Sequence, residues 1–92
     1  MVMDLKKIVQ AYVSIRNQMH SLLPDISEEI TSIIESNDTS VLRIEELLDT
    51  LLNFGQMGVG ESEFVRLNSY YALFNREYAG EYSKTYREMN EE

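Results

Sequence analysis

The sequence contains no cysteine, only one proline and no long run of apolar residues. The lack of cysteine excludes disulfide bonds, thiolate metal sites and a cysteine nucleophile, and it fits a reducing compartment. No apolar stretch approaches the roughly 20 residues that a membrane-spanning helix needs. Residues 1–10 are amphipathic and lack the uninterrupted apolar region of a signal peptide. We therefore expect a cytoplasmic protein that does not enter a membrane.

Residues that usually carry chemistry are also scarce. His20 is the only histidine, and a transition-metal site cannot be built from one histidine without cysteine. The adjacent carboxylates Glu28/Glu29 and Glu45/Glu46 could serve as an acid and a base only in a partly buried pocket that separates their pKa values. We expect them on exposed helix faces instead. The glycine-rich stretch lacks the lysine of a phosphate-binding loop. The sequence predicts no enzyme, no metal and no cofactor.

Basic residues are scarce in the middle of the chain. The protein has 92 residues, of which 43% are apolar, a composition that favours one folded domain over residues 1–92. The net charge is −8, divided unevenly into +2 for residues 1–24, −9 for residues 25–63 and −1 for residues 64–92. In the middle segment ten acids face a single base, Arg43. We call residues 25–63 the acidic block.

The first helix is expected over about residues 2–22, ended by Pro24, because proline disfavours helical geometry in the residue before it. Its apolar positions alternate in spacings of four and three, as in a coiled-coil seam. They are Met1, Leu5, Ile8, Tyr12, Ile15, Met19 and Leu22. This seam either packs on the other helices or pairs with a second copy of the chain. A homodimer is therefore one of our expectations.

Three further helices follow in the pattern. Asp25 with Glu28 has the form of a capping box for a helix over about 25–36. Ser40 or Thr39 can cap a helix over about 41–53, after which Gly55 would supply a left-handed terminal residue. The last helix is expected to begin near Ser62, with its aromatic stripe on one face and a kink at Gly80. The stripe consists of Phe64, Leu67, Tyr71, Phe74 and Tyr78. We predict an all-α, compact bundle of about four helices.

The tyrosines allow two interpretations. Six tyrosines could stack on nucleic-acid bases, but direct nucleic-acid binding needs a basic surface, and this protein is acidic. A core or interface role is therefore favoured. Tyr70 and Tyr71 are adjacent and cannot both point inward, so one of them is expected to be available to a protein partner.

The acidic block is the most unusual feature. A run of acids is usually only a solvated face. Here, however, it spans two predicted helices and their loops, and bases are present elsewhere in the chain. Duplex DNA carries about one charge per 1.7 Å, or on the order of 15 over 25 Å. The block reaches more than half that density if it spreads over helices ~20–25 Å long.

In length, acidity, lack of cysteine and the unneutralised stretches PDISEEITSIIESND and RIEELLDT, the chain resembles the small DNA-mimic anti-restriction proteins of T-even phages, the Arn group. The resemblance implies an inhibitor that presents carboxylates where host DNA-binding proteins expect phosphates. Implied targets are a restriction endonuclease of the McrBC kind and the nucleoid protein H-NS. The phosphate surrogates would be Asp25, Glu28, Glu29, Glu35, Asp38, Glu45, Glu46, Asp49, Glu61 and Glu63. The bases Lys6, Lys7 and Arg16 depart from an evenly acidic mimic and predict a one-sided surface.

A second hypothesis comes from a different class of function. The chain could be a helical interaction module, such as a toxin-immunity protein or an anti-CRISPR-type inhibitor. Such a module would recognise one partner through Tyr70 and Tyr71, and it would tolerate changes in the acids.

Overall fold

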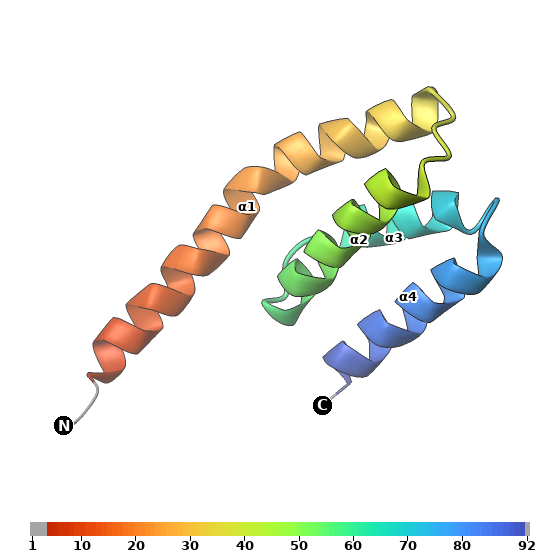
Figure 1. The fold of residues 1–92 in the computed structure, drawn as a ribbon. Coiled ribbons are helices and arrows are strands. Elements are labelled where there is room, and N and C mark those ends of the chain that lie inside the picture. The colour runs from red at the N-terminus through yellow and green to blue at the C-terminus, as the bar shows by residue number, and fades with distance from the viewer. Residues whose placement is uncertain (1–3, 92) are drawn as a thin grey trace.

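The computed structural model describes residues 4–91, and these form four α-helices and no β-strand. The helices are α1 (Leu5–Glu35), α2 (Val41–Gln56), α3 (Glu61–Tyr71) and α4 (Arg76–Asn90) (Figure 1). The prediction of an all-α bundle with four helices is confirmed. The divisions between the helices, however, fall in different places from those predicted.

Helix α1 runs without interruption through Pro24, so the prediction of two helices over 2–22 and 25–36 was wrong. Proline lacks an N–H group and cannot bond to the carbonyl of His20, which weakens the helix and bends it. Figure 1 shows a bend in the middle of α1. Beyond this point Ile30 and Ile33 are fully buried in the core, and their burial holds the helical course. We infer that tertiary packing outweighs a local penalty of about 3 kcal/mol.

The capping box expected at Asp25 was also wrong, because Asp25 lies inside α1. The N-cap of this helix is Asp4, whose carboxylate accepts a hydrogen bond from the backbone N–H of Lys6 at 3.0 Å. Ser40 caps α2 as predicted, and its hydroxyl accepts from the N–H of Arg43 at 3.4 Å.

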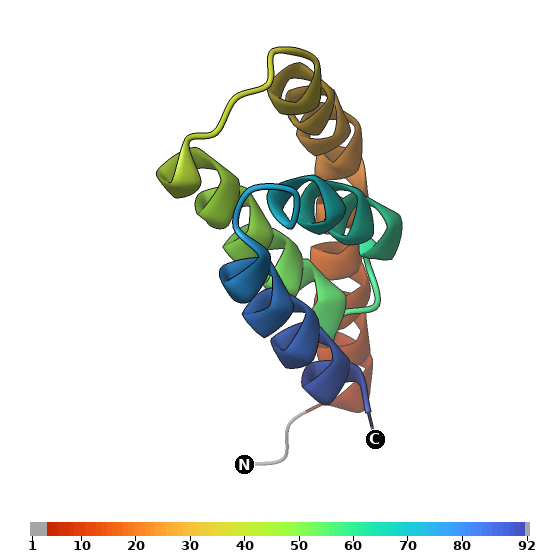
Figure 2. The same cartoon turned by 90° about the vertical axis from the view of Figure 1, so that its right-hand side faces the viewer.

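The hydrophobic core lies between the carboxyl-terminal half of α1 and the three shorter helices. Helix α3 packs against each of the other three helices, and α2 also packs against α4. The arrangement can be followed in Figure 2, in which α3 lies between α1 and α4. The buried apolar residues are Ile30, Ile33, Ile44, Leu48, Leu51, Phe54, Val59, Phe64, Leu67, Tyr71 and Ala79.

Gly55 lies inside α2 and does not terminate it, which corrects the sequence interpretation. A Cβ atom at this position would stand 2.8 Å from Cε2 of Tyr86, so the missing side chain lets the Tyr86 ring approach the helix. That ring stacks on Phe64 with centroids 4.3 Å apart. The glycines with positive φ are Gly58 and Gly60 in the connection to α3, where glycine is the least strained residue.

The expected single helix from Ser62 onward is in fact two helices, separated by residues 72–75. Tyr71 is completely buried at the end of α3. Asn75 closes the turn by donating hydrogen bonds from its N–H to the Tyr71 carbonyl and from Nδ2 to the Tyr71 hydroxyl. The reversal removes Phe74 and Tyr78 from the aromatic stripe and leaves them 40% and 52% exposed. Gly80 lies within the continuous helix α4.

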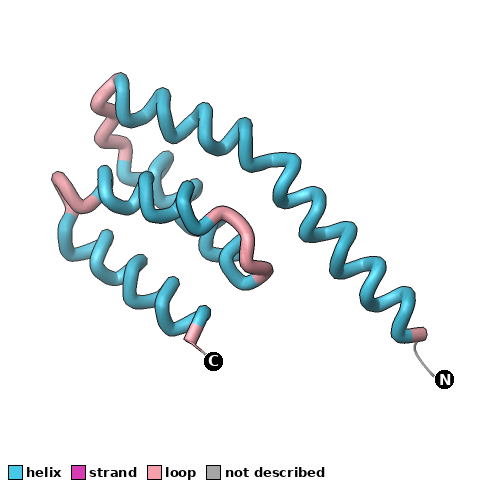
Figure 3. Tube along the Cα trace, turned by 180° about the vertical axis from the view of Figure 1, so that it is seen from behind, coloured by secondary structure: helices cyan, strands magenta, loops and turns pink. Residues whose placement is uncertain are grey.

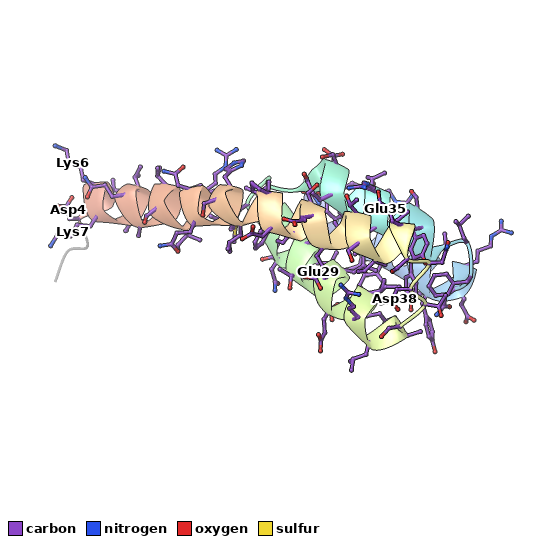
Figure 4. The ribbon with its side chains drawn as sticks, turned by 90° about the horizontal axis from the view of Figure 1, so that it is seen from above. Asp4, Lys6, Lys7, Glu29, Glu35 and Asp38 are labelled. Atoms are coloured by element: carbon purple, nitrogen blue, oxygen red, sulfur yellow. The ribbon has the colours of Figure 1, made fainter. Side chains whose placement is uncertain are left out.

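The amino-terminal half of α1 extends away from the bundle, as the views from behind and from above show (Figures 3 and 4). We call residues 5–22 the arm and residues 23–90 the body. The radius of gyration is 15.3 Å, whereas a compact chain of this length has about 12 Å. The principal extents of 52 × 27 × 19 Å reflect the same elongation. None of the described helices combines the length and hydrophobicity needed to cross a membrane.

Candidate acidic binding surface

Three acids of the block lie on the outer face of α1. Asp25, Glu28 and Glu35 are exposed, and their spacing of three and seven residues places them on one side of the helix. The buried residues Ile30 and Ile33 occupy the opposite side. Within residues 4–91 these three carboxylates make no salt bridge and no side-chain hydrogen bond. We call them the α1 acidic face.

A second group of acids is paired with Arg43 at the junction of α1 and α2. Arg43 forms salt bridges with Glu29 at 3.1 Å and with Asp38 at 2.8 Å. Figure 4 shows Glu29 and Asp38 on the side of α1 where α2 lies. The backbone N–H of Ser40 donates to Asp38 at 2.8 Å, and this bond together with Arg43 lowers the pKa of Asp38. These two carboxylates therefore stabilise the α1–α2 connection, and together with Arg43 they keep a net charge of −1.

A third group lies on α2 beside the aromatic residues of α3 and α4. The Tyr71 hydroxyl donates to Oε2 of Glu45 at 2.6 Å, and the Tyr82 hydroxyl donates to Oδ1 of Asp49 at 2.8 Å. Burial, and secondly these bonds to carboxylates, raise the pKa of both tyrosines well above the ordinary value. The phenols remain neutral donors and hold the two carboxylates in place. Glu46 points outward and is exposed.

The last two acids are at the beginning of α3. Glu61 and Glu63 lie in its first turn, where negative charge interacts favourably with the helix dipole. The Ser62 hydroxyl donates to Glu63 at 3.0 Å. Both residues therefore favour the beginning of α3 at this point.

The ten predicted surrogates thus do not share one even face. Three are unpaired on the outside of α1, two are paired with Arg43, two are held by tyrosines, two begin α3, and Glu46 stands apart on α2. The only salt bridges within residues 4–91 are those of Arg43. The bases Lys6, Lys7 and Arg16 lie on the arm, away from the block. The α1 acidic face is therefore the best candidate for contact with another macromolecule.

The expected partner contact at Tyr70 and Tyr71 needs correction. Tyr71 is fully buried and cannot reach a partner. Tyr70 is half-buried, and its hydroxyl donates to the backbone carbonyl of Asp38 at 2.8 Å. The exposed apolar residues of this region are instead Leu73, Phe74 and Tyr78, of which Leu73 is 82% exposed. Sequence reasoning missed them because their exposure follows from the break between α3 and α4.

Metal-binding groups and pockets were sought among the described residues. These residues contain no group of three or more histidine, cysteine or acidic side chains that could hold a metal ion. A shallow hollow between α3 and α4 includes Asn68, Arg76 and Ser83, but no carboxylate or histidine lines it. No protein-family model, no curated protein and no solved structure matches this chain.

Proposed function

We propose that the protein is a DNA-mimic inhibitor that occupies the DNA-binding cleft of host proteins with its acidic surface. The targets would be a restriction endonuclease of the McrBC kind or the nucleoid protein H-NS, as expected for a phage protein that acts in the host cytoplasm. It would bind these proteins and not nucleic acid, because its net charge of −8 repels phosphates.

The observation that carries the proposal is the α1 acidic face. From Asp25 to Glu35 the helix rises about 15 Å, and its three exposed carboxylates have no basic neighbour in ion-pair contact among residues 4–91. Duplex DNA presents on the order of nine charges over that length. The face alone is thus less dense than DNA, so other acids and the shape of the protein must add to its affinity.

The carboxylates of Glu45 and Asp49 support the proposal in a different way. Each accepts a hydrogen bond from a tyrosine, so its position is restricted before a partner arrives. A phosphate in duplex DNA is similarly restricted. Preorganised acceptors lose less conformational freedom on binding than free side chains do.

The test is a gel-shift competition in which the protein displaces a labelled DNA duplex from purified H-NS or from the endonuclease. We expect displacement that weakens as salt concentration rises, because exposed charges are screened. The variant carrying Asp25→Lys, Glu28→Lys and Glu35→Lys should compete at least about tenfold less well, since each exposed charge contributes up to about 1 kcal/mol.

The matched control carries Glu77→Lys, Glu81→Lys and Glu88→Lys on α4, which changes the net charge equally outside the block. It should retain most of the competition. Equal losses in both variants would mean that net charge, and not the α1 acidic face, is responsible. Reversal of Glu45 or Asp49 is a poorer test, because it also removes the partner of a tyrosine.

A second candidate function rests on the apolar residues beside the α3–α4 turn. Leu73, Phe74 and Tyr78 together could anchor a protein partner, as exposed aromatic residues often do. This interaction module would lose its partner on Leu73→Ser with Tyr78→Ala and would tolerate the triple lysine variant on α1. The DNA mimic would show the reverse pattern.

A further inference from the structure

The arm exposes a continuous apolar seam. Leu5, Ile8, Tyr12, Ile15 and Leu22 are between 43% and 74% exposed. Their spacings of three, four, three and seven residues keep them on one side of the helix. An amphipathic helix normally covers such a stripe with another element, but no described element of the same chain covers this one.

The seam continues a stripe that is buried in the body. Leu5, Tyr12, Met19, Ile26 and Ile33 follow one another at intervals of seven residues. Ile33 is fully buried, Ile26 and Met19 are half-buried against the core, and Tyr12 and Leu5 are exposed. The same helical stripe is therefore covered by the body at one end and uncovered along the arm.

The amount of exposed surface is large for a protein of this size. The chain exposes 6522 Å², whereas a compact monomer of 10.7 kDa exposes about 5,500 Å². The excess is about 1,000 Å² per copy, or about 2,000 Å² for two. A stable interface between two proteins buries about 1,200–2,000 Å² in total. Pairing of two arms would remove an area of this size.

We propose that the arms of two copies pair as an antiparallel coiled coil. In the seam, Leu5, Tyr12 and Met19 occupy a positions, and Ile8, Ile15 and Leu22 occupy d positions. Antiparallel helices place an a residue of one chain beside a d residue of the other.

In a symmetric register that brings residue 5 of one chain beside residue 22 of the other, every seam residue has an apolar partner. It places Leu5 opposite Leu22, Ile8 opposite Met19 and Tyr12 opposite Ile15, each pair occurring twice across the two-fold axis. Over 18 residues the paired length is about 27 Å. Each bulky residue then faces an aliphatic partner, and no polar residue falls in the seam.

Charge favours the antiparallel orientation over the parallel one. Lys6 and Lys7 lie near the amino-terminal end of the arm. The acidic block begins at Asp25, just after the point where the arm joins the body. Parallel pairing would bring the two acidic bodies together and would also bring the lysines of both chains together. Antiparallel pairing places the two acidic bodies, and the lysines of the two arms, at opposite ends of the coil.

The first test is the mass of the protein in solution, measured by sedimentation equilibrium at high micromolar concentration. We expect twice the chain mass of 10.7 kDa. Ile8→Glu with Ile15→Glu, both at exposed seam positions, should halve the mass and leave the unfolding midpoint of the body nearly unchanged. Gln10→Glu with Asn17→Glu adds the same charge on the opposite face and should remain a dimer. A monomeric unmodified chain, or equal dissociation of both variants, would overturn the proposal.

The second test uses the absence of cysteine, which makes single-cysteine variants clean probes. On oxidation, a mixture of Leu5→Cys and Leu22→Cys chains should form a disulfide between the two variants. Neither variant should link to itself, because its cysteines lie at opposite ends of the coil. Self-linking of each variant would indicate parallel pairing and would overturn the proposed arrangement.

The arm is basic and amphipathic, so a membrane surface is the main competing occupant. The unmodified protein should remain in the supernatant with vesicles that contain an anionic lipid. A monomer that sediments with these vesicles would assign the seam to lipid and overturn the dimer. The proposed dimer does not depend on the proposed function, since mass and cross-linking are measured without any target.

Discussion

The hydroxyl of Tyr71 donates a hydrogen bond to Oε2 of Glu45 over 2.6 Å, so a fully buried phenol on α3 holds a carboxylate of α2 at the edge of the core. Asn75 donates a further hydrogen bond to the same hydroxyl at 2.9 Å. This small network connects the end of α3, the following turn and α2. It links the stability of the bundle to the position of an acid in the block.

Tyr71→Phe should therefore destabilise the protein by about 2 kcal/mol, because it removes a hydrogen bond to a charged group and leaves the Asn75 donor without its partner. Tyr82→Phe is the comparison, since its bond to Asp49 is exposed and should contribute only about 0.5–1.5 kcal/mol. Urea denaturation measures both values. A larger loss for Tyr82→Phe than for Tyr71→Phe would contradict the assigned roles.

Stability should decrease at alkaline pH. Burial and carboxylate neighbours raise the pKa of Tyr71 and Tyr82 in the folded protein above the ordinary value of 10.0. The unfolded chain therefore loses these protons first as the pH rises. Their stabilising contribution is fully present below pH 10.0 and is lost progressively above it. The midpoint temperature of thermal unfolding, measured by circular dichroism, should therefore decrease as the pH rises above 10.0.

The double variant Tyr71→Phe with Tyr82→Phe controls for other groups that titrate at high pH. Its midpoint should fall less steeply above pH 10.0 than that of the unmodified protein. Equal slopes would show that these two phenols do not cause the alkaline transition.

Gly55 and Gly80 form a matched pair for a test of packing. Gly55→Ala should destabilise by about 1–2 kcal/mol, because its Cβ would lie 2.8 Å from the Tyr86 ring and the ring would have to shift. Gly80→Ala meets no atom within 4 Å, so it should stabilise by up to about 1 kcal/mol through helix propensity. Denaturant unfolding of both variants measures the change in the free energy of unfolding. A change of the same sign in both variants would contradict the observed packing.

Pro24→Ala should stabilise the protein by about 1–3 kcal/mol. The substitution supplies the missing N–H donor to the His20 carbonyl and removes the clash of the proline ring. Pro24 is exposed, so little packing is lost. Ser14→Ala in the arm is a suitable control and should change stability by less than about 0.5 kcal/mol. A destabilised Pro24→Ala variant would mean that the bend of α1 is required for packing in the body.

The helical class and the approximate position of α2 could be predicted from the sequence, because apolar spacing reports directly on helical faces. The Ser40 cap could also be predicted, since its hydroxyl acts within one turn. The break between α3 and α4 could not, because nothing in ALFN requires it locally. It follows from the burial of Tyr71 and the turn that Asn75 closes around it.

The candidate site shows the same division. Ten acids and one base in residues 25–63 can be counted without a structure. Which acids remain free cannot be counted, because Arg43 reaches Glu29 across 14 residues of sequence and Tyr71 reaches Glu45 across 26. The packing of whole helices determines these partners, so the local spacing of residues in the sequence cannot predict them.

By itself, the sequence determined that the chain is helical, free of cysteine chemistry and strongly acidic in its middle third, since these properties depend on composition and short-range periodicity. Tertiary structure alone decided that α1 continues through Pro24, because the burial of Ile30 and Ile33 outweighs a local defect. It also decided that Asp25, Glu28 and Glu35 stay unpaired within the described chain. Long-range contacts select among the structures that local patterns allow, because burial of a whole helix face contributes more free energy than one broken backbone hydrogen bond.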